Sequence, residues 1–427
     1  MQFYDFKEIQ ERVILIGVQT GADEDVEASL DELEELAQTA GAETAAKVIQ
    51  NREAVHPGTY IGKGKIQEVR NLLTALDANG VICDDELSPS QMNNLERELE
   101  CKVMDRTLLI LDIFATRAVT SEGKIQVELA QLRYRSARLV GLRDSLSRLG
   151  GGIGTRGPGE KKLETDRRLI RTRISALKAE LVQVEKHREL IRGSRSRGSL
   201  KTAAIVGYTN AGKSTLLNTL TGAGILAEDK LFATLDPTTR VLELNDGQQI
   251  LLTDTVGFIR KLPHHLVEAF KSTLEEAKYA DYIIHVVDVS NPQAEMQMAV
   301  VYETLRELGA SGKKVITLLN KQDLASDLEL RDIHADYTVR CSARTGKGLE
   351  DLKEILSRLL SQDQVYIEEL YSYKEAGKLQ LIREYGQLLS EEYREDGIFV
   401  QAKIPREYFV RVMPHCKKRD KTKSIFL

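Results

Sequence analysis

Residues 207–214 of the 427-residue chain read GYTNAGKS, which matches the G-x-x-x-x-G-K-S pattern of a phosphate-binding loop. The pattern follows an apolar run typical of a strand and precedes apolar residues at helical spacing, as such a loop requires. Backbone N–H groups of the loop and of the helix N-terminus then face the phosphates of a nucleotide. Lys213 places a positive charge beside the β- and γ-phosphates, and Ser214 offers its hydroxyl to Mg²⁺. The sequence therefore predicts a nucleoside triphosphate site with Mg²⁺ as a cofactor.

Three more motifs follow apolar strands, and ligands of open α/β sheets bind at the carboxyl ends of such strands. In the stretch 254–257, DTVG, the aspartate can hold Mg²⁺ through water, and the N–H of Gly257 can reach the γ-phosphate. Residues 320–323, NKQD, discriminate between bases, because a carboxylate accepts two N–H groups of guanine that adenine lacks. Residues 342–344, SAR, can bring a backbone N–H to the guanine carbonyl. In this order the motifs specify a GTPase and disfavour an ATPase.

The Mg²⁺-binding threonine is expected in the segment 231–239, LFATLDPTT, which offers three candidates. We expect Thr234 to bind the ion, with Thr238 or Thr239 as the alternative. The expected metal ligands are Ser214, Thr234 and, through water, Asp254. The expected catalytic residues are Lys213, Thr234 and Gly257. The residues expected to contact GTP are Gly207, Tyr208, Thr209, Asn210, Ala211, Gly212, Lys213, Ser214, Thr215, Phe232, Ala233, Thr234, Leu235, Asp236, Asp254, Thr255, Val256, Gly257, Asn320, Lys321, Gln322, Asp323, Ser342, Ala343 and Arg344.

Two residues bear on the expected rate of hydrolysis. Phe258 stands directly after the D-x-x-G stretch, where a glutamine would orient the attacking water, and a phenyl ring cannot do so. We therefore expect slow hydrolysis by the isolated chain and acceleration by a partner, by about 10³–10⁵-fold as in related systems. Asn210 occupies the position at which some GTPases hold K⁺ as an extra charge beside the phosphates. K⁺ as a second cofactor is one hypothesis, and a hydrogen bond of Asn210 within its own loop is the other.

Residues 150–159, GGGIGTRGPG, contain a literal G-x-G-x-x-G, the pattern of a dinucleotide-binding loop. The run does not follow a strand, however, because apolar residues recur at threes, fours and sevens over 124–149 and again over 163–191. Two long amphipathic helices joined by glycines predict an antiparallel helical hairpin with a thin tip. Such a tip can enter a narrow crevice in an RNA and contact phosphates. The residues expected to bind RNA are Arg148, Gly150, Gly151, Gly152, Arg156, Lys161 and Lys162.

Charge supports an RNA-facing hairpin. Between Lys124 and Lys201 the chain has 20 Lys plus Arg against 8 Asp plus Glu, a net charge of +12. The whole chain carries −5, so the remainder carries −17. This asymmetry indicates a local polyanion-binding element, and the plain alternative is an arginine-rich solvated helix face.

The motifs GYTNAGKS, FATLDPTTR, DTVGFI, NKQD and SAR, preceded by RLGGGIGTRGPGEKKLE, resemble those of the HflX family of ribosome-associated GTPases. The resemblance runs from residue 58 to the end of the GTPase domain, and the glycine-rich run distinguishes this family from the wider GTPase class. It implies GTP-dependent binding to the large ribosomal subunit and its rRNA, and separation of stalled or idle ribosomes. The resemblance also suggests, as a hypothesis, that the N-terminal domain binds ATP. Residues 62–65, GKGK, are the local candidate, although a glycine turn before a helix explains them more simply.

The elements that position these motifs alternate between strands and helices, which predicts an α/β fold. The GTPase domain is expected to have a mostly parallel sheet flanked by helices. In the C-terminal domain we expect a strand near 365–369, a helix over 374–389 and a strand over 397–404. The expected domains are a small α/β domain (1–121), the basic hairpin with its linker (122–199), the P-loop GTPase domain (200–361) and a small α+β domain (362–427).

Composition limits the remaining function classes. No apolar run approaches the roughly 20 residues that span a membrane, and the N-terminus lacks the apolar core of a signal peptide. Four scattered cysteines show no metal-ligand spacing, as in a reduced cytoplasmic protein. We expect a cytoplasmic monomer that associates with ribosomes. The alternative is a regulatory GTPase that acts on a protein partner through a coiled-coil arm, which the +12 charge of the hairpin disfavours.

Overall fold

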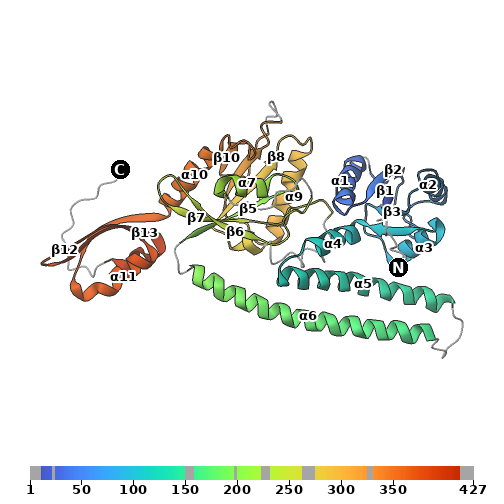
Figure 1. The fold of residues 1–427 in the computed structure, drawn as a ribbon, viewed down its shortest axis with the longest axis horizontal. Coiled ribbons are helices and arrows are strands. Elements are labelled where there is room, and N and C mark those ends of the chain that lie inside the picture. The colour runs from blue at the N-terminus through green and yellow to red at the C-terminus, as the bar shows by residue number, and fades with distance from the viewer. Residues whose placement is uncertain are drawn as a thin grey trace, which may run out of the picture.

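The computed structural model describes residues 11–21, 25–149, 158–196, 200–222, 231–261, 275–324 and 330–413. Three sheets lie in a row along an elongated molecule, and two long helices run beside two of them (Figure 1). The predicted fold class is confirmed: a parallel α/β domain, a helical hairpin, a P-loop domain with a mixed sheet and a small antiparallel C-terminal sheet. Across the described ranges, no helix combines the length and the apolar character needed to cross a membrane.

The N-terminal domain is built on a four-stranded parallel sheet in the order β2-β1-β3-β4. Apolar residues of α1 and α4 pack on one face of this sheet, and those of α2 and α3 pack on the other. The central strands are therefore buried on both sides, which explains their continuous apolar sequences. The elements are β1 (Arg12–Gln19), α1 (Val26–Thr39), β2 (Glu43–Asn51), α2 (Lys63–Ala75), β3 (Gly80–Cys83), α3 (Pro89–Leu99), β4 (Lys102–Asp105) and α4 (Arg106–Arg117).

The hairpin consists of α5 (Ser121–Leu149) and α6 (Pro158–Ser196), which lie side by side below the two larger domains in Figure 1. The predicted pair of long helices is confirmed. Ile174, Leu177 and Leu181 occupy the seam that the spacing predicts on α6, and each is buried or half-buried. The seam of α6 therefore packs against α5 of the same chain.

The third domain has a six-stranded sheet in the order β10-β9-β8-β5-β7-β6, parallel except for the edge strand β6. Helices α7 and α10 cover one face, and α9 covers the other. The predicted, mostly parallel sheet flanked by helices is confirmed. The elements are β5 (Lys201–Gly207), α7 (Lys213–Thr221), β6 (Thr238–Glu243), β7 (Gln249–Asp254), β8 (Tyr282–Asp288), α9 (Ala294–Glu307), β9 (Lys314–Asn320), β10 (Tyr337–Arg340) and α10 (Leu349–Gln362).

One hydrophobic cluster continues from the N-terminal domain into the third domain. It joins Leu30 and Phe114 of the first to Phe232 and Phe258 of the second. The rings of Phe114 and Phe232 meet edge to face, with centroids 4.6 Å apart and planes at 72°. The two domains are thus held together by a shared core.

The C-terminal domain is a three-stranded antiparallel sheet in the order β11-β13-β12, with α11 and α12 packed on one face. The helix predicted over 374–389 is wrong at its end, because α11 stops at Tyr385 and residues 387–394 form a strand. Gly386 explains the stop: a Cβ there would lie 2.7–2.9 Å from Ile404 and from two backbone carbonyls. The elements are β11 (Gln364–Tyr371), α11 (Ala376–Tyr385), β12 (Gln387–Arg394), β13 (Gly397–Pro405) and α12 (Arg406–Val412).

Candidate functional site

The stretch 207–214 leaves β5 and enters α7, as predicted from its sequence. Gly207, Asn210 and Gly212 have positive φ angles of 156°, 60° and 97°. A Cβ on Gly207 would lie 2.3 Å from the carbonyl oxygen of Val286, and one on Gly212 would lie 2.4 Å from the amide of Asn320. The two glycines are therefore required by the close approach of neighbouring strands, and the loop curls at the carboxyl edge of the sheet.

Lys213 is a buried cation that has no carboxylate partner among the described residues. Its Nζ donates hydrogen bonds to the carbonyl oxygens of Tyr208 at 2.7 Å and Gly207 at 3.2 Å. Burial lowers the pKa of the ammonium to about 8, although the Asp254 carboxylate acts in the opposite direction. An ammonium held only by carbonyls is poised for an anionic ligand, since a phosphate would supply the missing negative charge.

Three oxygen ligands converge beside the loop. Ser214 Oγ donates to Asp254 Oδ2 at 2.7 Å, Thr234 Oγ1 donates to the same oxygen at 3.0 Å, and the two hydroxyls lie 2.8 Å apart. Thr238 and Thr239 lie on β6 instead, and Thr239 meets Thr253 across the sheet. Of the three candidate threonines, Thr234 alone reaches this oxygen cluster.

The oxygen cluster fits Mg²⁺. Asp254 is fully buried, and its Oδ1 has no hydrogen-bond partner among the described residues. Burial raises the pKa of this carboxyl and outweighs Lys213 and the hydroxyls of Ser214 and Thr234, which lower it. A buried, half-partnered carboxylate with two hydroxyls is an all-oxygen donor set, the kind that hard divalent cations prefer.

The base-recognition motifs meet at the same edge of the sheet. Asn320 donates its amide to the carbonyl of Ala211 at 2.8 Å and accepts the N–H of Ala343 at 2.8 Å, so it ties the phosphate loop to the SAR stretch. Lys321 pairs with Asp288 at 2.6 Å. A hydrogen bond from Ser342 lowers the pKa of the exposed Asp323 carboxyl. The charge of Arg344 also lowers the pKa of Asp323, and the Gln322 N–H donates to the Cys341 carbonyl at 3.2 Å.

The D-x-x-G stretch lies directly over the phosphate loop. Thr209 N–H donates to the Phe258 carbonyl at 2.8 Å, and Phe258 N–H donates to the Gly207 carbonyl at 3.1 Å. A Cβ on Gly257 would lie 2.8 Å from Thr209 and 2.9 Å from Lys213 Nζ. The remaining cleft has a volume of only about 50 Å³ and is lined by Thr209, Asn210, Gly212, Lys213, Ser214, Thr215, Phe232, Ala233, Thr234, Thr255 and Gly257.

Other predicted GTP contacts direct their side chains elsewhere. Leu235 and Val256 belong to the core shared with the N-terminal domain, as does the phenyl ring of Phe258. The Asp236 carboxylate turns toward the start of α5, where it accepts the N–H groups of Val119 and Thr120. The side chains of Leu235, Val256 and Asp236 thus anchor the loops that surround the cleft.

Contacts from the N-terminal domain reach the phosphate loop, and no motif predicts them. Tyr208 Oη donates to Glu32 at 2.7 Å and accepts the N–H of Arg260 at 2.8 Å. Glu32 is held in turn by the buried guanidinium of Arg106 at 2.5 Å. Lys261 pairs with Asp84 at 2.6 Å. The consecutive acidic residues Asp84 and Asp85 after β3 indicate a cluster of ion pairs, but their partners lie far away in the sequence.

The predicted RNA-binding residues fall largely outside the described part of the chain. Gly150, Gly151, Gly152 and Arg156 belong to the undescribed stretch 150–157. Arg148 lies near the end of α5, and Lys161 and Lys162 lie in the first turn of α6, so all three flank the hairpin tip. Their role stays a prediction.

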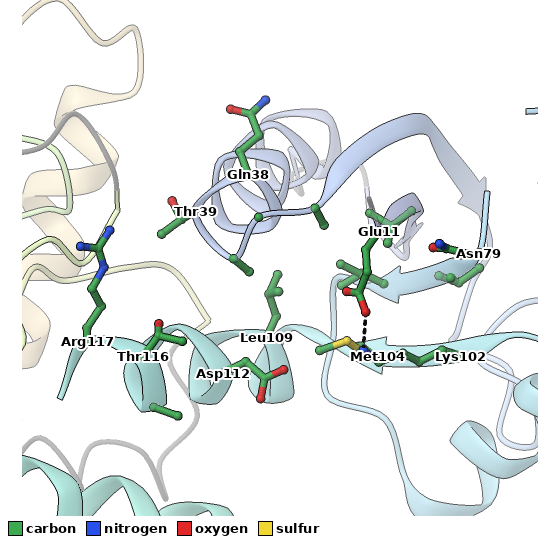
Figure 2. A pocket seen from close by; sticks show the side chains of 18 residues that line it. Glu11, Gln38, Thr39, Asn79, Lys102, Met104, Leu109, Asp112, Thr116 and Arg117 are labelled. Carbon is green, nitrogen blue, oxygen red and sulfur yellow. Dashed lines mark hydrogen bonds and ion pairs between the residues drawn. The ribbon is translucent and has the colours of Figure 1, made fainter. Parts of the chain in front are cut away.

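A larger cavity of about 680 Å³ lies in the N-terminal domain, away from the phosphate loop (Figure 2). Leu109, Asp112 and Thr116 of α4 line one side, and Lys102 pairs with Glu11 across the floor. It opens at the amino ends of the strands, opposite the edge at which α/β sheets bind ligands.

The GKGK stretch at 62–65 does not border that cavity. Gly62 caps the start of α2, its N–H donates to Gln50 at 2.9 Å, and a Cβ there would lie 2.6 Å from Arg52. The turn before a helix that the sequence suggested accounts for these residues.

Three segments of the chain match models of protein families. Residues 27–115 match the GTP-binding GTPase N-terminal model, and residues 117–195 match the GTP-binding GTPase Middle Region. Residues 202–321 match the 50S ribosome-binding GTPase model. The matched segments correspond to the N-terminal sheet domain, the hairpin and the domain that carries the phosphate loop.

Curated relatives align along nearly the whole chain. GTPase HflX of Lacrimispora saccharolytica is 69% identical over 409 residues, which cover 96% of this chain and 97% of the relative. GTPase HflX of Escherichia coli is 43% identical over 408 residues, which cover 94% and 95%. Among solved structures, a GTP-binding protein from Sulfolobus solfataricus in complex with GDP has 27% identity and a TM-score of 0.46, and covers 83% of this chain and 99% of its own. On its identity to these relatives, the chain is a GTPase and belongs to the HflX family.

Proposed function

We propose that the protein binds the large ribosomal subunit in its GTP state, contacts rRNA with the tip of its helical hairpin and separates stalled or idle ribosomes. The observation that carries this proposal is the direct joining of a guanine-nucleotide site to the +12 hairpin. Phe232 and Asp236, which flank the metal-site threonine, contact α4 and the start of α5. A change at the nucleotide can therefore move the arm that carries the positive charge.

Each residue at the cleft has a defined part in hydrolysis under this proposal. Lys213 leaves the two loop carbonyls and neutralises the β- and γ-phosphates, and Gly257 moves off Thr209 so that its N–H meets the γ-phosphate. Ser214, Thr234 and Asp254 are the residues that would hold Mg²⁺, the aspartate through water. The bound ion supplies charge stabilisation at the transferring phosphoryl group. Asp323 accepts the guanine N–H groups.

No side chain near the cleft orients the attacking water in the described part of the chain. Phe258 stands at that position, and its ring is 2% exposed in the shared core. We infer slow hydrolysis by the protein alone and stimulation by ribosomes. A purified chain that turned over at the stimulated rate without ribosomes would contradict this inference.

K⁺ as a second cofactor remains a separate proposal. Asn210 lines the cleft together with Lys213 and Ser214, and its backbone has a positive φ of 60°. A cation held there would add positive charge where some GTPases use an arginine. Hydrolysis in the presence of ribosomes is expected to be faster in KCl than in NaCl, and equal rates would remove K⁺ from the account.

Co-sedimentation with ribosomal subunits tests the proposed function. Binding to the large subunit is expected with a GTP analogue and weak with GDP, and it is expected to fall steeply across a salt series. Replacing residues 150–159 with a short tight turn is expected to spare GTP binding and weaken subunit separation. Arg173→Gln is the matched control, because it removes one hairpin arginine about 20 Å from the tip. Loss of GTP affinity in the tip variant, with the fold intact, would contradict the assignment of the tip to RNA.

The second candidate function is a switch that acts on a protein partner through a coiled-coil arm. Leu177 is buried and Ile174 and Leu181 are half-buried on the seam of α6, which counts against this candidate, since α5 already occupies the seam that a partner helix would need. We expect a cytoplasmic monomer. Binding of the hairpin to a protein with no dependence on salt or ribosomes would favour the second candidate.

A further inference from the structure

The first turn of α5 has a capping box with one member missing. Thr120 is the N-cap: its carbonyl accepts the N–H of Lys124 at 3.0 Å, and its Oγ1 accepts the N–H of Gly123 at 3.0 Å. In a complete capping box the third residue of the helix is Glu or Gln, and its side chain accepts the N–H of the N-cap residue. Here that residue is Gly123, which has no side chain.

Asp236 supplies the missing acceptor from another domain. Its Oδ2 accepts the N–H of Thr120 at 2.9 Å and that of Val119 at 3.0 Å, and its Oδ1 accepts the hydroxyl of Thr120. A Cβ on Gly123 would lie 2.6 Å from Asp236 Oδ1. Glycine at this position is therefore what lets the carboxylate of a distant loop take the place of a local glutamate. The positive end of the α5 dipole also favours this carboxylate.

The segment around Asp236 is the one that carries Thr234 to the metal site. Phe232, two residues before Thr234, packs edge to face on Phe114 of α4. Asp236, two residues after it, holds the start of α5. Thr234 lies between these anchors, with its hydroxyl at hydrogen-bond distance from Ser214 and Asp254. Both anchors of the metal-site threonine thus belong to the α4–α5 junction, outside the GTPase domain.

We propose that Asp236 is a positioning residue for GTP hydrolysis. By completing the capping box of α5 from the GTPase domain, it holds the Thr234 hydroxyl against Ser214 and Asp254. The coupling is reciprocal: a displacement of the base of α5 withdraws Thr234 from the metal site, and release of Thr234 frees the base of the arm. This role rests on the GTPase activity and does not require the ribosomal part of the proposed function.

The competing explanation is that Asp236 only stabilises α5. The two explanations separate in the variant pair Asp236→Ala and Asp236→Ala with Gly123→Glu. The second variant restores the capping box within α5, because the introduced glutamate side chain occupies the space that the aspartate leaves. It restores the helix cap and leaves Thr234 without its anchor. Ser88→Ala is the matched control, since it removes an ordinary capping box from α3 far from the cleft.

For Asp236→Ala we expect hydrolysis to fall by about 10- to 100-fold, the cost of a misplaced catalytic group. The Mg²⁺ concentration for half-maximal hydrolysis is expected to rise, whereas GDP affinity is expected to change little. The double variant is expected to regain the melting temperature of the parent but not its rate. Ser88→Ala is expected to lower the melting temperature and leave the rate unchanged.

Amide exchange supplies a readout that does not depend on activity. In the nucleotide-free protein, exchange over residues 231–236 is expected to be faster in Asp236→Ala and to stay fast in the double variant. Exchange at Thr120 and Gly123 is expected to rise in the first variant, and protection around Thr120 is expected to recover in the second. Recovery of hydrolysis and of protection over 231–236 in the double variant would reduce Asp236 to a helix cap. A parental rate in Asp236→Ala would also overturn the proposal.

Discussion

The parallel N-terminal sheet and the mostly parallel GTPase sheet meet at their carboxyl edges, where Lys261 pairs with Asp84, and the two edges are used in opposite ways. At the edge of the N-terminal sheet, the oxygens of Asp84 are taken by Arg106 at 2.6 Å, Ser29 at 2.8 Å and Lys261 at 2.6 Å. At the edge of the GTPase sheet, within the described part of the chain, Asp254 Oδ1 has no partner and the buried Lys213 donates hydrogen bonds only to carbonyls. We name the first the docking edge (Asp84, Asp85, Asp105) and the second the nucleotide edge (207–214, Asp254).

The pKa shifts of the two buried aspartates show the same contrast. Burial raises the pKa of Asp84, but Arg106 and Lys261 outweigh it, so the net direction is downward. Burial also raises the pKa of Asp254, and there Lys213 and two hydroxyls do not outweigh it. An acidic strand end is thus part of the structure when cations of the chain neutralise it, and a ligand site when the chain leaves it under-neutralised.

The largest expected effect concerns Lys213. In Lys213→Met, hydrolysis is expected to fall by at least about 10²–10³-fold, the cost of losing one preorganised charge. The nucleotide-free protein is expected to keep its stability, because Lys213 pairs with no carboxylate in the part of the chain that the structure describes. Single-turnover hydrolysis and chemical denaturation measure the two effects. A large loss of stability of nucleotide-free Lys213→Met would contradict the contrast between the two edges, because it would give Lys213 the same structural role as the cations of the N-terminal sheet.

Arg106 at the docking edge should behave in the opposite way. Arg106→Met is expected to lower the free energy of unfolding by about 3–5 kcal/mol, since it strands buried carboxylates at Glu32 and Asp84. Guanine-nucleotide affinity of the folded fraction is expected to stay near that of the parent. Arg106→Met with Asp84→Asn is the matched variant and is expected to recover part of the loss. An unchanged denaturation midpoint in Arg106→Met would contradict this description of the docking edge.

The pH dependence of nucleotide binding should report Lys213. Its folded pKa is about 8 against an ordinary value of 10.5, so GDP affinity is expected to fall as the pH rises above about 8. The fall approaches tenfold per pH unit, because binding needs the charged ammonium. Stability without nucleotide should rise between these two pKa values, where the unfolded chain binds more protons than the folded one. Lys213→Met is the control, and a parental profile that matched it would count against a perturbed Lys213.

The smallest expected effect is at Lys261, the half-exposed partner of Asp84. Its side chain is 38% exposed, so solvent screens the pair. Lys261→Met is expected to cost about 0.5–1 kcal/mol of stability, well below the cost of Arg106→Met. A thermal denaturation series with both variants measures the order. An equal or larger loss of stability in Lys261→Met would show that solvent exposure does not determine how much each ion pair of the docking edge contributes to stability.

The nucleotide edge was largely predictable from the sequence, because its information is local. The strand, the glycines and the helix around 207–214 lie within twenty-one residues, and Thr234, the threonine that the loop motif favours, lies at hydrogen-bond distance from Asp254. The hairpin was predictable for the same reason, since the regular spacing of apolar residues along each helix is also local information. The motifs that follow β7, β9 and β10 are far apart in the sequence and meet only through the pairing of these strands in the sheet. Their meeting was nevertheless predictable, because the carboxyl ends of parallel strands lie at the same edge of a sheet.

The docking edge and the arm's anchor were not predictable. Glu32, Arg106 and Tyr208 are far apart in the sequence, and a single sequence does not say which charges meet. Asp236 was assigned to GTP as part of a loop motif, and its carboxylate lies instead on α5 because Gly123 leaves room for it. The helix predicted over 374–389 is too long, because apolar residues continue past Gly386 into the strand β12.

We propose that guanine recognition at the nucleotide edge drives the protein's action on ribosomes. Asp323→Asn tests it directly, because an amide N–H₂ no longer accepts the guanine N–H groups but can donate to the extra carbonyl of xanthine. We predict that this variant loses GTP-dependent binding to the large ribosomal subunit and gains xanthosine-triphosphate-dependent binding. The parent, measured in parallel, should respond to GTP alone. Unchanged GTP-dependent co-sedimentation of Asp323→Asn, with no response to xanthosine triphosphate, would contradict the account.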